Sequence, residues 1–207
     1  MSRGTDGDEQ THPVVTEERA ALAVIRIDRP EQRNSLSAAT LDDLDVAFST
    51  LSARDDINAI IFTGTRDVFA SGADIRELRT LTPETALEFA RRGQALFQKI
   101  SEARQLTIAA INGYCMGGGL DLALACRIRV ASPTAIFAHP GARLGIITGW
   151  GGTQRLPALV GIARAIEMFT TARRLSAEEA FDCGLVTRIC PDSLACAFEV
   201  ISRQSPS

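Results

Sequence analysis

The sequence is poor in aromatic residues and in histidine, and it has no excess of positive charge. Aromatic side chains make up 5% of the 207 residues, and the two histidines are His12 and His139. Lysine and arginine together number 22 against 25 aspartates and glutamates, which gives a net charge of −3. Proteins that bind nucleic acids usually carry a basic patch, and those that bind single strands also need aromatic platforms. We therefore expect no nucleic-acid partner.

Cysteine pairs and long apolar runs are also lacking. The cysteines form no C-x-x-C pair, so we expect no zinc site and no other bound metal. Their scattered arrangement is typical of a reducing cytoplasm, where each would be a small apolar residue. The five are Cys115, Cys126, Cys183, Cys190 and Cys196. Because no apolar run approaches the ~18 residues of a membrane span and no signal peptide is visible, we expect a cytoplasmic protein without a membrane partner.

Length and patterning predict one domain behind a short leader. Residues 1–15 are polar and predict a disordered leader, and residues 16–207 form the expected core domain. Buried strands are predicted at 20–28, 58–63, 106–111, 127–131, 135–137 and 185–189. Helices are predicted at 37–51, 82–100, 154–159 and 162–170, and from a capping box at 176–179. This alternation predicts an α/β domain with a largely parallel sheet.

Two glycine turns share one layout, in which a strand ends, glycine turns the chain and a helix begins. They are FASGADI at 69–75 and MGGGLD at 116–121. Neither has the G-x-G-x-x-G dinucleotide fingerprint, the lysine of a Walker loop or the G-x-S-x-G elbow of a hydrolase. The first N–H groups of a helix are free to stabilise a negatively charged oxygen. The turns are therefore interpreted either as close packing against the sheet or as two halves of an oxyanion hole.

Three segments resemble, in the right order, signatures of the enoyl-CoA hydratase/isomerase (crotonase) superfamily. The first is FASGADIREL, which is similar to F-x-x-G-A-D-[IL]-x-E. The second is AAINGYCMGGGLDLALACRIRVA, which is similar to A-x-x-N-G-x-x-x-G-G-G-x-[ED]-L-x-x-x-C-D. The third is FAHPGARLGIITGWGGTQRLPALVG, which is similar to the P-E-x-x-L-G…G-G-T-Q-R-L run. The resemblance implies a crotonase-like (ClpP/crotonase) spiral of ββα units and an acyl-CoA thioester as substrate.

The resemblance also implies roles for particular residues. The backbone N–H groups of Ala73 and Gly118 would hold the thioester oxygen and stabilise an enolate. The stretch that would line the coenzyme A side comprises Ala73, Asp74, Ile75 and Arg76, and Arg29 and Arg33 are candidates for its phosphates. The implied reaction is hydration of a 2-enoyl-CoA to a 3-hydroxyacyl-CoA, a lyase reaction of fatty-acid degradation. It needs no cofactor besides the coenzyme A that the substrate carries.

Both glutamates of the family's hydratases are changed in this sequence. The first position carries Asp121, which is one methylene shorter, and the second carries Gly141, which has neither acid nor base. His139 is interpreted either as a structural histidine or as a substitute acid–base group. Arg143 would pair with Asp121, meet a substrate carboxylate or remain a surface charge. Trp150 would either form a wall of the acyl pocket or simply pack in the core.

The end of the sequence is a second departure from the family. Members usually continue with several helices, so the resemblance implies a fold that lacks most of the C-terminal helical region. We expect Leu194, Phe198 and Ile201 to lack packing partners and the chain to associate as a homotrimer or hexamer. Besides hydration, two alternatives stay open. One is another crotonase-fold reaction (decarboxylation, thioester hydrolysis or isomerisation), and the other is a catalytically weak acyl-CoA-binding protein.

Overall fold

The main sheet of the molecule is largely parallel. The computed structural model describes residues 13–202, and its largest sheet has the strand order β1-β2-β4-β7-β9-β12. The strands are β1 (Val14–Arg19), β2 (Leu22–Ile27), β4 (Ala59–Thr63), β7 (Leu106–Ile111), β9 (Ile128–Ala131) and β12 (Arg188–Ile189). β1 and β2 pair in antiparallel fashion, and every other neighbouring pair is parallel. The predicted α/β class with a parallel sheet is confirmed.

A second sheet of short strands produces the spiral. Its order is β11-β10-β8-β5, with β5 (Val68–Ala70), β8 (Tyr114–Met116), β10 (Ile136–Ala138) and β11 (Leu175–Ser176). β5 follows β4, β8 follows β7 and β10 follows β9, so each turn of the chain adds one strand to each sheet. A third pair joins β3 (Ser35–Leu36) to β6 (Gly72–Ala73). The sequence does not predict β3, β5, β6, β8 and β11, because strands of two or three residues carry too few side chains to show a pattern. It does not predict the six-residue strand β1 either, because most residues of β1 are polar and form no apolar run.

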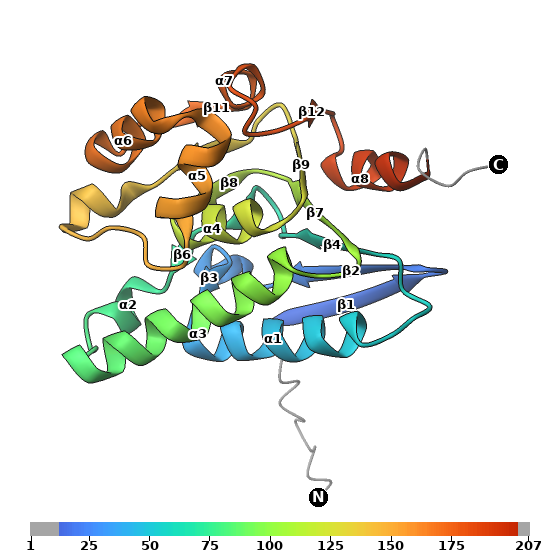
Figure 1. Ribbon diagram of the computed structural model, residues 1–207, viewed down its shortest axis with the longest axis horizontal. Helices are drawn as coiled ribbons and strands as arrows, with labels where there is room; N and C mark the ends of the chain where they lie inside the picture. The colour runs from blue at the N-terminus through green and yellow to red at the C-terminus, as the bar shows by residue number, and fades with distance from the viewer. Residues whose placement is uncertain (1–12, 203–207) are drawn as a thin grey trace, which may run out of the picture.

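Helices pack on both sides of these sheets (Figure 1). They are α1 (Ala38–Ser52), α2 (Ile75–Leu78), α3 (Pro83–Ser101), α4 (Gly118–Ala125), α5 (Gly152–Val160), α6 (Ile162–Thr171), α7 (Ala177–Asp182) and α8 (Ser193–Ser202). Figure 1 shows α1 and α3 side by side below the main sheet, α4 near the centre, and α5, α6 and α7 above it. Ser37 caps α1, and Ser176 and Glu179 form the predicted capping box of α7. These local signals worked because a cap needs only neighbours in the sequence.

The last described helix has a packing surface of its own, which corrects one expectation. Leu194, Phe198 and Ile201 of α8 pack against an apolar cluster on the main sheet that includes Ile61 and Ile108. α8 therefore covers the face of β4, β7 and β9 opposite the main core, as Figure 1 shows. The prediction that these three side chains lack partners is wrong. Their partners lie on strands about 90–140 positions earlier, which the sequence did not reveal.

Two smaller predictions also need correction. β1 begins at Val14, inside the leader predicted for residues 1–15, and residues 1–12 lie outside the described part of the chain. Cys190 and Cys196 form a disulfide, whereas Cys115, Cys126 and Cys183 are free. The prediction of five unpaired apolar cysteines is therefore wrong for two of them. Cysteine usage consequently lends the cytoplasmic prediction less support than the sequence suggested.

Residues 13–202 contain neither a membrane-spanning helix nor a cluster of metal-ligating side chains. None of the helices in this part combines the length and apolarity that crossing a membrane requires. No group of three or more histidine, cysteine, aspartate or glutamate side chains in the same part is arranged to hold a metal ion.

Candidate functional site

A cavity of about 260 Å³ opens at the centre of the molecule, where several elements end or begin. Its walls come from β6, α2, α3, the start of α4 and the segment 139–150. Most of the lining is apolar or glycine, and it includes Ala73, Ile75, Phe89, Gly118, His139 and Trp150. An apolar cavity with a few polar groups is typical of a small-molecule site.

The two glycine turns lie against each other at this cavity. A Cβ atom at Gly72 would come within 3.1 Å of the Gly118 nitrogen, so the close approach requires glycine there. The Asp74 N–H donates to the Leu36 carbonyl. Because N–H groups alternate in direction along a strand, the N–H of Ala73 points away from β3. Gly118 is the first residue of α4, so its N–H has no partner within the helix.

Asp74 and Arg76 serve the local structure of α2 instead of lining the cavity. Asp74 caps α2 by accepting a hydrogen bond from the Arg76 backbone N–H at 2.9 Å, and it accepts another from Ser35 at 3.1 Å. The Arg76 guanidinium holds the pKa of Asp74 well below its usual range. The Arg76 side chain is 72% exposed. Of the residues expected at the coenzyme A side, Ala73 and Ile75 reach the cavity, whereas Asp74 and Arg76 do not.

Asp121 is fully buried behind the cavity wall. One carboxylate oxygen, Oδ2, accepts a hydrogen bond from the Thr148 hydroxyl. The other, Oδ1, lies so close to Gly152 that a Cβ atom there would overlap it. Burial raises the pKa of Asp121 to about 7, although the Thr148 hydroxyl, the Trp150 backbone and the charge of Arg155 act in the opposite direction. The carboxyl group is therefore poised to change its charge near neutral pH.

His139 lies between the Asp121 carboxyl and the cavity. Its ring is 2% exposed and lines the cavity, and its Nε2 lies 3.6 Å from Asp121 Oδ1. The ring packs on Phe169 of α6 at 4.9 Å between centroids. Neither ring nitrogen of His139, nor Asp121 Oδ1, has a hydrogen-bond partner among the described residues. Burial lowers the pKa of His139 to about 4, so both groups are neutral between about pH 4 and pH 7.

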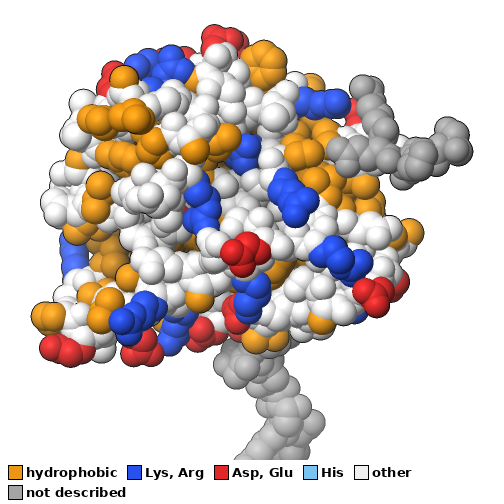
Figure 2. Space-filling model, in the orientation of Figure 1, with side chains coloured by type: hydrophobic (Ala, Val, Ile, Leu, Met, Phe, Trp, Pro, Cys, Tyr) orange, Lys and Arg blue, Asp and Glu red, His pale blue; other side chains and the backbone are white. Residues whose placement is uncertain are grey.

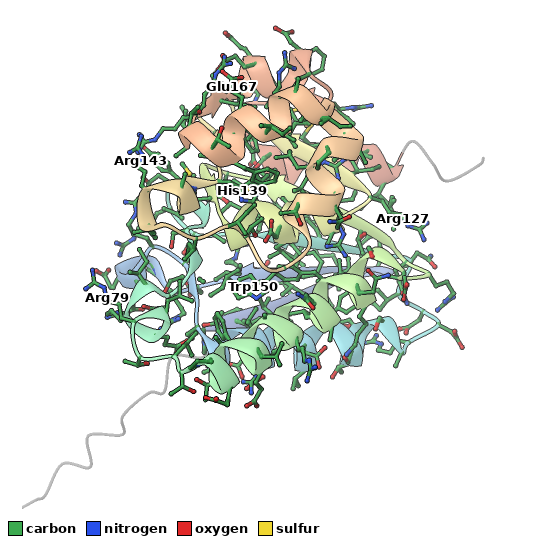
Figure 3. All side chains as sticks on the ribbon, turned by 60° about the vertical axis from the view of Figure 1, so that its left-hand side comes forward. Arg79, Arg127, His139, Arg143, Trp150 and Glu167 are labelled. Atoms are coloured by element: carbon green, nitrogen blue, oxygen red, sulfur yellow. A yellow bond between two sulfur atoms is a disulfide. The ribbon has the colours of Figure 1, made fainter. Side chains whose placement is uncertain are left out.

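Trp150 is a core residue that also forms part of the cavity wall. Its ring is 4% exposed and lies between the α-carbons of Gly93 and Gly118, where a Cβ atom would overlap it. The ring centroids of Phe89 and Phe97 lie 5.2 and 5.7 Å, respectively, from the centroid of the Trp150 ring. In Figure 3, His139 and Trp150 lie in the middle of the molecule, whereas Arg79, Arg127, Arg143 and Glu167 lie at its edge.

A family model for enoyl-CoA hydratase/isomerase matches residues 17–200 of the chain. The chain belongs to the enoyl-CoA hydratase/isomerase family. Among curated relatives of this family, it is 36% identical over 177 residues to a short-chain-enoyl-CoA hydratase of Clostridium acetobutylicum. It is 39% identical over 177 residues to a crotonyl-CoA hydratase of Syntrophomonas wolfei. Each alignment covers 85% of this chain and 68% of the relative.

Solved structures of the enoyl-CoA hydratase/isomerase family confirm the fold. An enoyl-CoA hydratase from Thermoplasma volcanium superposes with a TM-score of 0.90 at 34% identity, covering 95% of this chain and 79% of that one. An enoyl-CoA hydratase from Bacillus anthracis gives 0.88 at 33% identity, covering 92% and 76%. The predicted crotonase-like fold and the hydratase-type enzyme class are thereby confirmed.

The position of the second family glutamate has no room for a side chain. A Cβ atom at Gly141 would lie 2.5 Å from the carbonyl oxygen of Ile146. A glutamate there would therefore force the segment 140–146 to move. Arg143, two residues on, is exposed, whereas Asp121 is fully buried with Thr148 and His139 as neighbours. Of the three interpretations of Arg143, the pairing with Asp121 is wrong, because sequence spacing gave no information on burial, and its exposure agrees with a surface charge.

The two arginine candidates for phosphate binding differ in their surroundings. Arg29 donates from Nη1 to the Ser35 carbonyl, the Ser37 hydroxyl and the Thr40 hydroxyl at 2.9–3.0 Å, so its guanidinium holds the start of α1 in place. Arg33 is exposed and lies over the ring of Tyr114 at 5.1 Å. Of the two, Arg33 is the one whose guanidinium is accessible to a phosphate.

Proposed function

We propose that this family member binds an acyl-CoA thioester and stabilises its enolate between the N–H groups of Ala73 and Gly118. The supporting observation is the contact of the two glycine turns at one apolar cavity. Charge develops on the thioester oxygen as the enolate forms, and one well-placed donor is worth about 3–4 kcal/mol in the transition state. The reaction we propose is hydration of a 2-enoyl-CoA to the 3-hydroxyacyl-CoA, as in fatty-acid degradation. The names of the two curated hydratases support this choice.

The coenzyme A part of the substrate would extend from the cavity past α2. Ile75 is 47% exposed and also lines the cavity, so it offers an apolar contact at the mouth. The exposed guanidinium groups of Arg33 and Arg76 supply positive charge for phosphates on the outside. Under this proposal the enzyme needs no cofactor beyond the coenzyme A of its substrate.

A homotrimer or hexamer in the cytoplasm remains our proposal for the assembly and its location. Exposed apolar side chains support self-association, and Figure 2 shows hydrophobic side chains gathered at the upper left of the view. Among the exposed apolar residues, Leu159, Ile162 and Ile166 belong to α5 and α6, which occupy that side of Figure 1. Light scattering on the purified chain would give the oligomeric state, and a monomer would contradict the proposal.

The test of the proposed function is turnover of crotonyl-CoA. Loss of the enoyl-thioester absorbance would be followed with the purified chain, and calorimetry would measure binding of butyryl-CoA, which has no double bond to hydrate. Free coenzyme A is the matched ligand control, because it lacks the acyl group that the apolar cavity would take. Turnover together with tighter binding of butyryl-CoA than of coenzyme A would support the proposal. Absence of acyl-CoA binding would contradict it.

A second candidate is another reaction on an acyl-CoA thioester in which negative charge develops on the thioester oxygen. Gly141 provides no acid or base, and Asp121 does not line the cavity, so hydration lacks the two glutamates that the resemblance implies. Decarboxylation, thioester hydrolysis and isomerisation would each still need the two N–H donors. Malonyl-type, 3-enoyl and saturated acyl-CoA thioesters would distinguish these reactions. Binding of acyl-CoA without turnover of any thioester would indicate a catalytically weak binding protein.

A further inference from the structure

The pair formed by Asp121 and His139 carries three buried polar atoms without partners. They are Asp121 Oδ1 and both ring nitrogens of His139, and the two side chains are 0% and 3% exposed, respectively. Buried polar atoms are nearly always hydrogen-bonded, because an unpaired one has lost its water without replacement. Such a cluster at the wall of an apolar cavity indicates that a ligand supplies the missing partner.

Only one member of the pair can meet a bound molecule. Asp121 does not line the cavity. Its Oδ2 accepts a hydrogen bond from the Thr148 hydroxyl, and Gly152 lies against its Oδ1. His139 does line the cavity, and it sits between the cavity and Asp121. When Nε2 carries the proton toward Asp121 Oδ1, Nδ1 keeps a lone pair that can accept another proton. The imidazole therefore lies between the carboxylate and the cavity that would hold the substrate, with both ring nitrogens buried from solvent.

We propose that His139 is the catalytic acid–base residue of this enzyme and that Asp121 is the positioning residue behind it. The proposal rests on the proposed function, since it assumes an acyl-CoA thioester in the cavity. The separation of 3.6 Å between Nε2 and Oδ1 is longer than a hydrogen bond. Catalytic hydrogen bonds often shorten only when substrate binds, so this distance is compatible with the role.

A single base can carry out the hydration, because the proton that it removes from water is the one that it returns to the α-carbon. Neutral His139 takes a proton from a water molecule while the water oxygen bonds to the β-carbon of the enoyl thioester. The electron pair of the C=C bond moves to the α-carbon and the thioester oxygen, where the N–H groups of Ala73 and Gly118 stabilise it as an enolate. The imidazolium then gives its proton to the α-carbon, and the thioester C=O forms again. One water is added, and His139 and Asp121 return to their starting states.

The surroundings of the pair predict the pH dependence of this step. Arg155 of α5 is the charged group that acts on Asp121, and Phe169 of α6 offers only an apolar face to His139. The Cys115 thiol of β8 stays neutral, because burial raises its pKa well above the usual value. The carboxylate of Asp121 stabilises the imidazolium only when it is ionised. Turnover is therefore expected to rise with pH around 7 and to level off above it.

Two substitutions test the roles on crotonyl-CoA turnover. His139→Gln should lower kcat by about 10²–10³-fold with little change in KM, because it removes the proton carrier. Asp121→Asn should lower kcat less and abolish the rise of activity around pH 7. Asp182→Asn is the matched control, since Asp182 is an exposed carboxylate on α7 and should leave the profile unchanged. If Asp121→Asn keeps the pH dependence, or His139→Gln keeps its kcat, the proposal is overturned.

Exchange of the α-proton of butyryl-CoA in D2O separates this proposal from the hydratase assignment. The exchange needs only enolate formation, with His139 removing and returning the proton, and NMR follows it without any hydration. If the unaltered protein exchanges the α-proton but does not hydrate crotonyl-CoA, and His139→Gln stops the exchange, the hydratase assignment fails while the role of His139 stands. In His139→Ala, added imidazole should restore exchange at least tenfold. Exchange that is independent of His139 would overturn the proposal.

Discussion

Two regions meet at the cavity, and they are built in different ways. The glycine turns present backbone N–H groups, whose positions depend on where β6 ends and α4 begins. The acid–base region depends on the side chains of Asp121, His139 and Thr148, which come from three separate segments. Backbone donors need only the fold, whereas a proton-transferring group needs particular side chains and their burial. Under the proposed function, one fold can keep enolate stabilisation while the acid–base residues change.

Trp150 connects the two regions. Its ring lies against the α-carbon of Gly118, and its backbone lies near the Asp121 carboxyl, whose pKa it lowers. Substitutions at Trp150 should disturb both regions, whereas a substitution within one region should leave the other region unchanged.

Replacing the connecting residue is expected to have the largest effect. Trp150→Ala removes a ring packed between Phe89, Phe97 and two glycines, and should lower the free energy of unfolding by about 3–5 kcal/mol. Urea denaturation would measure it, with Ile162→Ala at a 70% exposed position as the control. A loss below about 1 kcal/mol would mean that the ring is not packed as described.

The shifted pKa values of Asp121 and His139 should make the free energy of unfolding depend on pH. Asp121 has its pKa raised from 3.8 to about 7, so its contribution to stability falls as the pH rises between these values. His139 has its pKa lowered from 6.5 to about 4, so its contribution falls as the pH drops from 6.5 to 4. In the unaltered protein the two changes nearly cancel between pH 4 and 6.5. Each single substitution should therefore expose the other residue's contribution.

The two variants should change in stability in opposite directions as the pH rises. Relative to the unaltered protein, Asp121→Asn should lose about 3 kcal/mol on going from pH 6.5 to 4, because only His139 still contributes. His139→Gln should lose about 3 kcal/mol on going from pH 4 to 6.5, because only Asp121 still contributes. Urea unfolding at several pH values would measure both. Curves that change in the same direction would show that the two groups do not have opposite shifts.

A change confined to the glycine turns should be smaller in stability but severe in activity. In Gly118→Ala the new Cβ overlaps the Trp150 ring, which should cost about 1–3 kcal/mol of stability and move the N–H donor. Crotonyl-CoA turnover should fall by about 10²-fold, and the unfolding free energy would be measured alongside. Gly149→Ala is the stability control, because its Cβ would have nothing closer than 4.0 Å. Equal stability of Gly118→Ala and Gly149→Ala would argue against the close contact between Gly118 and the Trp150 ring.

The smallest effect is expected at the outer edge of the glycine turns. The Arg76 side chain is 72% exposed, and the buried carboxylate of Asp74 keeps its hydrogen bonds from Ser35 and from the backbone N–H of residue 76 when the guanidinium is removed, so Arg76→Ala should change stability by only about 1 kcal/mol. Butyryl-CoA affinity should fall severalfold if Arg76 meets a coenzyme A phosphate, and calorimetry would measure it at low salt. Arg164→Ala on α6 serves as the charge-matched control. Unchanged affinity would remove Arg76 from the binding residues.

Local patterns predicted much of the framework. The caps of α1 and α7, the apolar strands of the main sheet and the two glycine turns all depend on residues within a few positions of one another. The short strands were missed, because two or three residues give no periodicity. The partners of α8 were missed as well, because they lie on strands far away in the sequence.

For the candidate site, the sequence indicated Asp121, His139, Ala73 and Gly118 through motif and spacing. It did not indicate that Thr148 donates a hydrogen bond to Asp121 or that Gly152 lies against Asp121. Nor did it indicate that the Phe169 ring packs on His139. The only available signals were the small residues and the apolar helix of the segment 148–171, which fit many other roles. Distant segments meet only in the folded chain, so their neighbours cannot be found by inspecting the sequence locally.

The sequence by itself determined where the chain turns, which strands are buried and which chemical groups are available, because these follow from backbone preferences and apolar patterning. It also determined that a carboxylate shorter than glutamate and a histidine stand near the expected catalytic positions. Only the tertiary structure decided that Asp121 is sealed behind His139 and that Gly141 cannot hold a side chain. The physical reason is that burial, and with it the pKa of each group, depends on atoms that segments from all parts of the chain bring together.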